Sequence, residues 1–164
     1  MPTELVASLT RSRWSEARHI IADPPSLLYV DAALPRDRHL ETIVRAFTGV
    51  GAGSAEQMLA NYTDDLVLEL PYANPPVYLE GKPTILAYLT RAFTVFQMTL
   101  GIGAVFATTD PDVVVVEYTS TGRALSTGRP YANSYVGIYW FRDSLICHVR
   151  EYYNPLVSAA ALAP

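Results

Sequence analysis

The segment from Cys147 to Pro155 constrains the fold more than any other part of the chain. Its side chains alternate in character and it stops at an Asn-Pro dipeptide, a pattern that predicts a β-strand ended by a proline. Because successive side chains of a strand point to opposite faces, one face carries Val149, Glu151 and Tyr153. The other face carries the remaining large side chains, His148, Arg150 and Tyr152.

Glu151 is the only carboxylate on the first of these faces. The strand-like runs that precede it are rich in Val, Ile and Tyr, so one face of this strand is expected to meet a core. An ionised carboxylate is rarely buried without a partner. Glu151 therefore belongs either to a salt bridge at the edge of a sheet or to a functional site, and this strand alone leaves both interpretations open.

Apolar periodicity predicts three helices upstream of this strand. The first is expected to begin at Asp37, which can cap a helix, and its apolar residues recur at the spacing of one helix face. These residues are Leu40, Ile43, Val44 and Phe47. A short second helix is expected after Ser54, because residues 54–57 form a capping-box pattern. The third opens at Gly81-Lys82-Pro83, with proline near its first turn.

Strand-like runs lie on both sides of the third helix. Leu66–Leu70 precedes it and follows Asp64-Asp65, which is expected to be a turn. The later runs are Thr99–Thr108, Val113–Thr121, Arg129–Phe141 and Leu145–Tyr153. Short turns join them, and the last turn is short enough for a hairpin. This order predicts an α+β domain in which three helices pack on an antiparallel sheet.

Composition narrows the class of protein. A chain of 164 residues with 50% hydrophobic content predicts one domain that can enclose a pocket as well as a core. A net charge of −4 with no basic run disfavours nucleic-acid binding. No apolar run approaches the roughly 20 residues of a membrane span. Cys147, the single cysteine, excludes an internal disulfide, and residues 1–10 do not resemble a secretory signal, so a cytoplasmic location is expected.

Familiar catalytic motifs are missing from the chain. His19, His39 and His148 have no metal-ligand spacing, so no metal is expected. There is no Gly-x-Ser-x-Gly elbow, dinucleotide fingerprint or phosphate loop, so no cofactor is expected either. Any chemistry must then come from acids, phenols and hydroxyls that line a cavity. The eleven tyrosines suit a planar, partly oxygenated ligand, because a phenol combines apolar area with a hydrogen-bonding tip.

Four strings in the sequence resemble one superfamily. They are Tyr62-Thr63-Asp64-Asp65, Gly81-Lys82-Pro83-Thr84-Ile85, Arg123–Tyr131 and Arg150–Pro155. Together with the order of elements they resemble the SnoaL-like superfamily, which includes nuclear transport factor 2, steroid isomerase, limonene epoxide hydrolase and SnoaL polyketide cyclases. The resemblance implies a cone-shaped α+β barrel over residues 38–158, an N-terminal extension at 1–37 and a tail at 159–164. This scaffold hosts unrelated activities, so the resemblance alone does not name a reaction.

Two of these relatives differ from the chain at their catalytic positions. The base aspartate of steroid isomerases precedes a proline, and the matching dipeptide here is Leu70-Pro71. The acidic oxyanion donors of those enzymes fall at Ser134 and Gly137. The Arg-x-Asp pair of limonene epoxide hydrolase falls at Tyr118 and Ser120, and only its second carboxylate has a counterpart, Glu151. Neither mechanism is expected to run unchanged.

Phenazine A/B-type proteins resemble the last strand more closely. Their Arg-Glu-aromatic pattern, in which the glutamate is the proposed general acid, matches Arg150-Glu151-Tyr152. The histidine that accompanies that glutamate has no counterpart here, because no histidine lies between His39 and His148. What remains is a lone glutamate in an aromatic pocket that donates or accepts a proton.

These observations predict a cofactor-independent acid–base enzyme of secondary metabolism. It would cyclise, isomerise or open an epoxide in a hydrophobic polyketide- or terpenoid-like intermediate. Glu151 is expected to be the general acid/base with a raised pKa, and Tyr118, Ser120 and Tyr135 are expected to hold negative charge. The expected substrate-binding residues are Phe47, Tyr72, Leu89, Phe93, Tyr139 and Tyr153. The alternative is a non-catalytic domain that binds a small molecule or a partner.

The resemblance also implies a homodimer. Members of the superfamily commonly pair through the outer face of the sheet. The candidates for that face are Trp140, His148, Arg150 and Tyr152. Large aromatic residues and arginine are enriched in interface cores, which agrees with this expectation.

Overall fold

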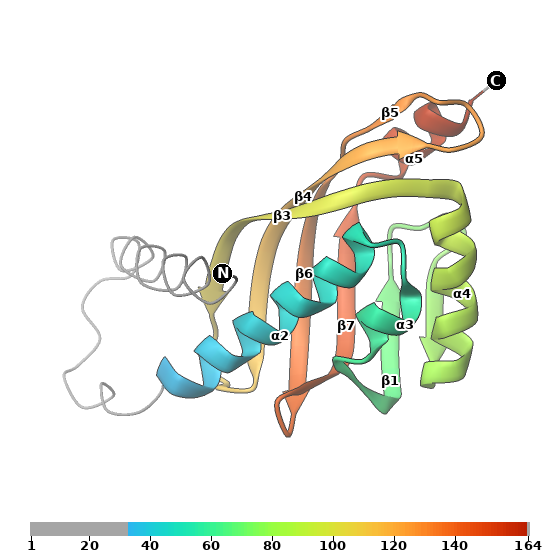
Figure 1. Cartoon of the computed structure of the whole chain (residues 1–164). Coiled ribbons are helices and arrows are strands. Elements are labelled where there is room, and N and C mark those ends of the chain that lie inside the picture. The colour runs from blue at the N-terminus through green and yellow to red at the C-terminus, as the bar shows by residue number, and fades with distance from the viewer. Residues whose placement is uncertain (1–32, 164) are drawn as a thin grey trace.

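The computed structural model describes residues 33–163, so the predicted N-terminal extension lies almost entirely outside the described residues. Its helices are α2 (Ala33–Gly51), α3 (Ala55–Leu59), α4 (Lys82–Val95) and α5 (Pro155–Leu162) (Figure 1). Its strands are β1 (Tyr62–Leu70), β2 (Val77–Glu80), β3 (Phe96–Ala107), β4 (Val113–Ala124), β5 (Pro130–Tyr131), β6 (Ser134–Arg142) and β7 (Leu145–Tyr153). No helix within these residues has the length and apolar character that a membrane crossing needs.

The helix starts follow local chemistry, with one correction. The Ser54 side chain accepts a hydrogen bond of 3.1 Å from the backbone N–H of Gln57, which confirms the predicted cap of α3. In α4, Pro83 occupies the first turn, as predicted. The prediction that Asp37 begins the first helix is wrong, because α2 already starts at Ala33. Proline is tolerated in the first turn of a helix, which is where Pro35 lies in α2.

The strands form one sheet in the order β2-β1-β7-β6-β4-β3, and β5 pairs with β4. All of these pairs are antiparallel except β1 and β7, which run parallel. The expectation of a wholly antiparallel sheet is therefore wrong at this one pair. The predicted turn at Asp64-Asp65 is also wrong, because β1 runs through both residues. The pairing of β1 with β7 is irregular between Tyr62 and Val67, which accommodates this polar stretch.

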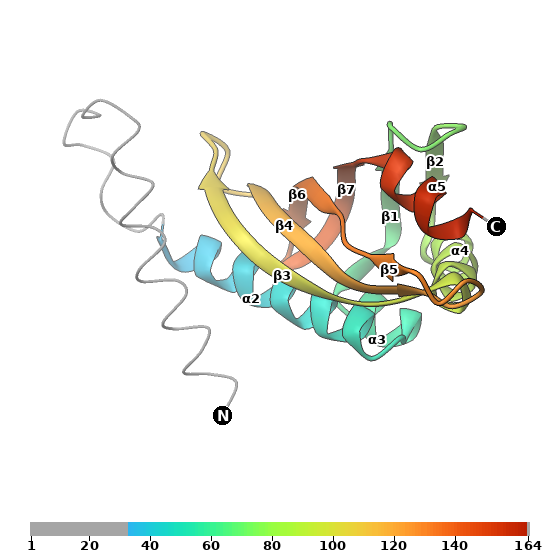
Figure 2. The same cartoon turned by 90° about the horizontal axis from the view of Figure 1, so that it is seen from above.

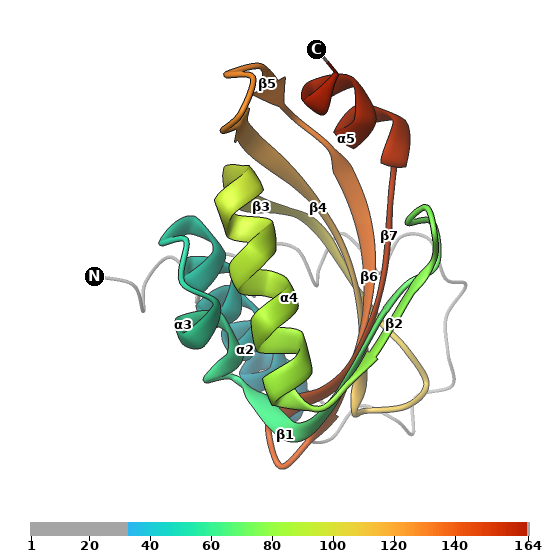
Figure 3. The same ribbon diagram turned by 90° about the vertical axis from the view of Figure 1, so that its right-hand side faces the viewer.

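The sheet curves around the helices, and the α+β cone is confirmed. Figure 3 shows α2, α3 and α4 inside the curve, with β1, β7 and β6 wrapped around them. The core fills the space between these layers, and its most buried large side chains include Ile43, Leu66, Ile85, Val114 and Ile146. The described helices leave the outer, convex face of the sheet uncovered.

One end of the cone is closed by α5, which the sequence did not predict. In Figure 2, α5 lies beside β5, at the end of the sheet far from the start of α2. The Thr127 hydroxyl donates to the carbonyl of Ala161 at 2.6 Å, and Arg129 donates to that of Ala160 at 3.3 Å. A small apolar cluster of Ala124, Tyr131 and Ala161 lies beneath the helix.

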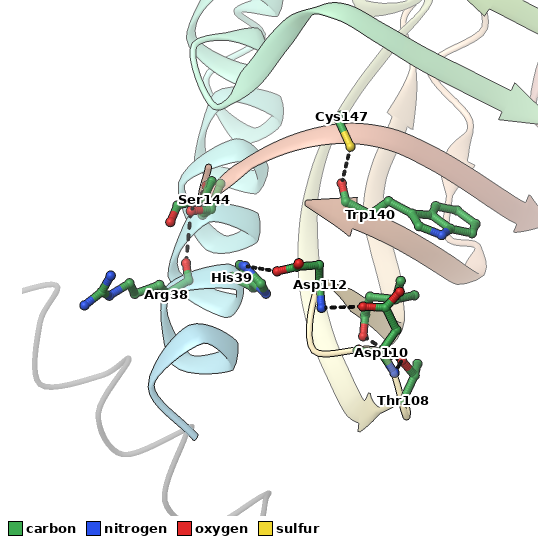
Figure 4. A network of polar contacts seen from close by, with 10 residues as sticks. Arg38, His39, Thr108, Asp110, Asp112, Trp140, Ser144 and Cys147 are labelled. Carbon is green, nitrogen blue, oxygen red and sulfur yellow. Dashed lines mark hydrogen bonds and ion pairs between the residues drawn. The ribbon is translucent and has the colours of Figure 1, made fainter. Parts of the chain in front are cut away.

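At the other end, His39 joins α2 to the sheet (Figure 4). Its ring stacks on Phe141 with 3.9 Å between centroids, and its Nε2 lies 3.8 Å from a carboxylate oxygen of Asp112. The side chain is buried, and its Nδ1 has no hydrogen-bond partner among the described residues. Burial lowers the pKa of His39, and the nearby Asp112 opposes this in part.

Candidate functional site

A cavity of about 210 Å³ lies between the concave face of the sheet and the helices. Residues from α2, α3 and α4 form one wall, and β1, β3, β4, β6 and β7 form the other; Tyr131 of β5 and Ser158 of α5 also line it. Several of the predicted site residues line it, namely Phe47, Leu89, Phe93, Tyr118, Tyr135, Tyr139, Glu151 and Tyr153. Two predicted members, Ser120 and Tyr72, do not.

Glu151 points into this cavity from β7. Val149 and Tyr153 line it as well, while Arg150 lies on the outer face, so the predicted alternation is confirmed. Across the sheet Glu151 pairs with Gly137, which has no side chain. A Cβ at position 137 would lie 2.5 Å from the ring of Tyr139, so the ring occupies the space that glycine leaves open.

Tyr118 holds the carboxyl group of Glu151. Its hydroxyl donates a hydrogen bond to Oε2, and no other described residue donates to either carboxyl oxygen. Burial raises the pKa of Glu151, and the hydrogen bond from Tyr118 lowers it to a smaller extent. Desolvation disfavours the charged form of a carboxyl group, so the predicted upward shift is confirmed in direction.

The phenol of Tyr118 belongs to a chain of hydrogen bonds. Tyr139 donates to the Tyr118 hydroxyl at 3.3 Å, and Tyr118 donates onward to Glu151. The Tyr118 ring lies parallel to that of Tyr135 at 4.8 Å and tilted against Phe47 at the same distance. Burial, followed by the charge of Glu151, raises the pKa of Tyr118 well above its ordinary value. The phenol therefore stays protonated and orients the carboxyl group.

A second set of polar side chains surrounds Ser120. The hydroxyls of Tyr131 and Tyr135 lie 2.7 Å apart, and Tyr135 donates to Ser120 Oγ at 3.1 Å. The backbone N–H of Asn133 donates to the same oxygen at 3.1 Å. Ser120 faces inward, but its hydroxyl lies behind Tyr135 and outside the cavity wall. Ser120 therefore does not line the cavity, contrary to expectation, and a role in holding negative charge on a ligand stays a prediction.

Tyr72 is a second correction. It is 61% exposed and its ring makes an edge-on contact with Tyr152, 5.1 Å between centroids. Leu70, the last residue of β1, does line the cavity. The chain leaves the strand at Pro71, so the alternation that would have carried Tyr72 inward no longer applies.

Tyr62 and Tyr88 are among the cavity residues that the sequence did not predict. Burial and then the charge of Glu151 raise the pKa of both phenols, which agrees with their position near this carboxyl group. No described residue forms a hydrogen bond with either hydroxyl. A signal for Tyr88 was present, because it follows Ile85 at the i+3 spacing of the apolar face of α4. Tyr62 is the first residue of β1 and precedes the predicted strand at Leu66–Leu70, so strand alternation was not applied to it.

The salt-bridge interpretation of Glu151 does not hold within residues 37–163, because none of their cationic side chains pairs with it. On the outer face, Glu69 has such partners instead. Arg150 donates two hydrogen bonds to its carboxylate at 2.9 and 3.0 Å, and His148 Nε2 lies 2.6 Å from Oε1. Trp140 stacks on His148 at 4.3 Å. The described residues contain no group of three His, Cys, Asp or Glu that could hold a metal ion.

Known proteins resemble the chain over most of its length. A PhzA/B-like protein of Pseudomonas aeruginosa, PA3332, is 30% identical over 131 residues, covering 74% of this chain and 88% of that protein. A Bacillus subtilis structure, provisionally assigned as an isomerase, is 26% identical with a TM-score of 0.73 and covers 77% of this chain and 94% of its own.

Two further matches concern the fold and the family. A structure from Xanthomonas campestris pv. campestris, provisionally assigned as a polyketide cyclase, is 22% identical with a TM-score of 0.68 and covers 79% of this chain and 99% of its own. At that identity the likeness extends to the fold alone. The model of the SnoaL-like domain family matches residues 43–149. With this match over more than half of its length, the chain belongs to the SnoaL-like domain family.

Proposed function

We propose that the protein is a cofactor-independent acid–base enzyme in which Glu151 transfers a proton to and from a small hydrophobic, partly oxygenated substrate. The observation that carries the proposal is the carboxyl group itself, which lies in an aromatic cavity with one neutral hydrogen-bond donor and a raised pKa. The isomerase and cyclase descriptions of proteins with the same fold favour a reaction of this kind. Cyclisation, isomerisation and epoxide opening all require such a proton transfer.

The two oxygens of Glu151 would have different roles. Oε2 accepts the hydrogen bond of Tyr118, which fixes the plane of the carboxyl group. Oε1 has no donor among the described residues and would exchange the proton with the substrate. A raised pKa keeps the group protonated closer to neutral pH, where it can donate a proton and take it back. The hydroxyls of Tyr62 and Tyr88 are available to bind an oxygen of the substrate.

The substitution Glu151→Gln tests the proposal. Wild-type protein would be incubated in deuterated water with a panel of one- and two-ring enones and epoxides, and deuterium uptake or rearrangement followed by mass spectrometry. Gln keeps the shape of the side chain but cannot transfer the proton, so kcat is expected to fall at least about 10²-fold with little change in binding. Burial favours the neutral form at this position, so thermal unfolding at pH 7 should occur no lower than in wild type.

The matched control is Glu117→Gln, the same substitution at an exposed position of β4. It should leave turnover unchanged. If Glu151→Gln turns over like wild type while folded, Glu151 is not the acid–base group.

A binding domain without catalysis is the second candidate function. The hydroxyls of Tyr118 and Tyr135 donate within the protein and not toward a ligand. They are therefore not free to hold negative charge on a reacting substrate, which favours this candidate. In that case the cavity would bind members of the panel, and wild type would exchange no deuterium into them.

A further inference from the structure

The charge of the cavity wall is the starting point. Among the described residues that line the cavity, Glu151 is the only Asp or Glu, and none is Lys, Arg or His. The nearest cation along the strand, Arg150, lies on the outer face and is bound to Glu69. An anionic ligand would therefore lose its hydration next to a carboxyl group and find no counter-charge, which is costly in an apolar site.

Aromatic rings form a large part of the remaining wall. Phe47, Phe93 and Phe96 line the cavity together with Tyr62, Tyr88, Tyr118, Tyr135, Tyr139 and Tyr153. The negative charge of Glu151 contributes to the raised pKa of each of these six phenols, after burial, which places them around the carboxyl group. The face of an aromatic ring attracts a cation, by about 0.5–2 kcal/mol according to how dry the site is.

Three of the six phenols around Glu151 have no proton to offer a negatively charged ligand, while the hydroxyls of Tyr62 and Tyr88 remain available. Tyr118 donates to Glu151, Tyr139 donates to Tyr118, and Tyr135 donates to Ser120. These three phenol protons are therefore already bound within the protein. A positive charge needs no donor, and the unpaired Oε1 of Glu151 can face it directly.

The volume limits the size of the ligand. An apolar cavity of about 150 Å³ in another protein accommodates benzene. At about 210 Å³, this cavity has space for one or two rings with short substituents.

We propose that the cavity is selective for positive charge: it binds a lipophilic ligand of one or two rings that carries a cation, or develops one at its reacting atom, beside Glu151. Ligands that bear carboxylate or phosphate are rejected. The inference rests on the site of the proposed function and narrows its chemistry. A proton passes from Oε1 to an oxygen or nitrogen of a neutral substrate, which leaves a carboxylate beside the new cation. Loss of a proton from the rearranged ligand then restores Glu151.

Binding of a permanent cation should depend on pH in one direction. The ion pair needs Glu151 in its charged form, so a quaternary ammonium ion displaces the proton that the buried carboxyl group holds. Its affinity therefore rises with pH until Glu151 is ionised in the free protein, and one proton is released per cation bound below that point. A neutral ligand of the same shape shows no such rise.

The test compares two isosteric probes and one anion with the full-length chain. Phenyltrimethylammonium and tert-butylbenzene have the same shape and differ in charge, and benzoate supplies the anion. At pH 8, NMR titration is expected to give a Kd for the cation at least about tenfold below that of tert-butylbenzene, the equivalent of 1.4 kcal/mol. Benzoate should bind at least about tenfold more weakly than tert-butylbenzene.

The variant Glu151→Gln separates charge from shape. It should remove the preference for the cation and its pH dependence, while the Kd of tert-butylbenzene stays within about threefold; the Glu117→Gln control should keep both. Equal affinity of the two isosteres in wild type, binding of benzoate as tight as that of the cation, or no binding of any probe would each overturn the inference. None of these outcomes concerns turnover, so the acid–base proposal stands or falls separately on the kcat of Glu151→Gln.

Discussion

Two neighbouring residues, Gly137 and Tyr118, determine the packing and the hydrogen bonding of the Glu151 carboxyl group. Gly137, opposite it in the sheet, leaves room for the ring of Tyr139, and Tyr118 donates to one carboxyl oxygen. The result is a carboxyl group whose pKa is raised by burial and held back by a single hydrogen bond. The strength of that bond can therefore be measured through the titration of Glu151.

Removing the Tyr118 hydroxyl should raise the pKa of Glu151 further. The hydrogen bond stabilises the charged carboxylate, so in Tyr118→Phe the protonated form persists to higher pH. If protonated Glu151 is the active form, the alkaline limb of the pH–rate profile moves upward, as does the ¹³C NMR titration of the carboxyl carbon. The lost acceptor of Tyr139 should also reduce the free energy of unfolding by about 1–3 kcal/mol.

The control for this variant is Tyr139→Phe, which removes the more distant phenol and keeps the bond from Tyr118 to Glu151. Its effect on the titration should be smaller. A Tyr118→Phe profile that coincides with wild type would mean that the bond does not set the protonation of Glu151.

Strand alternation was enough to predict which way Glu151, Val149 and Tyr153 point, because the period of a strand is fixed. It could not predict which groups the hydroxyls would bond. Tyr118 and Tyr135 were expected to hold negative charge on a ligand, yet they donate to Glu151 and Ser120. Such bonds depend on the positions of side chains from separate strands, which a pattern along one strand does not contain.

At the scale of elements, α2 depends on a buried histidine for its contact with the sheet. His39 has a lowered pKa, with burial the larger cause and Asp112 the opposing one. The folded state therefore binds the proton less readily than the unfolded chain. The contact is fully favourable above the ordinary pKa near 6.5, and its stabilisation is lost as pH falls through the lower, folded value.

The variant His39→Phe should make stability less sensitive to acid. Phenylalanine can stack on Phe141 as the imidazole does, and Nδ1 has no described partner to lose, so the free energy of unfolding at pH 7.5 should change by less than about 1.5 kcal/mol. Urea unfolding from pH 7.5 to pH 5 should then show a smaller loss in the variant than in wild type. Parallel curves would show that His39 does not carry the acid sensitivity.

Elements with strong local signals could be predicted, and others could not. The capping box at Ser54 and the short turn before Leu145 fixed their elements closely. Asn154-Pro155 was interpreted only as the end of a strand, but the same dipeptide begins α5, where Asn154 accepts a hydrogen bond of 3.0 Å from the N–H of Leu156. The short β2 was missed because its four residues form a strand only by pairing with β1.

At the scale of the whole molecule, the two faces of the sheet serve different purposes. The concave face lines the cavity, and the convex face carries Trp140, His148, Arg150 and Tyr152 without cover from the described helices. The Arg150 guanidinium lies 5.8 Å from the centre of the Trp140 ring and is held by Glu69. We propose that a second copy of the chain covers this face, because ordered aromatic and arginine side chains are typical of interface centres.

Light scattering at micromolar concentration should then report a particle of twice 18.0 kDa. Trp140→Glu places a charge in the proposed interface and should shift the protein to the monomer. Arg91→Glu, a charge change at an exposed position of α4, should not. A wild-type particle of 18.0 kDa would refute the dimer.

Trp140 on the convex face and the tyrosines of the cavity wall can each report optically on a different event. The chain has two tryptophans, and Trp140 stands on the convex face while the cavity wall contains tyrosines and no tryptophan among the described residues. Ligand binding should therefore perturb the near-ultraviolet absorption of tyrosine and leave the emission of Trp140 nearly unchanged. Subunit association should change the emission of Trp140, and among the tyrosines it involves Tyr152 of the same face. With Trp14 replaced by Phe, Trp140 is the single tryptophan, so one sample in one cuvette can follow association through its emission and ligand binding through tyrosine absorption.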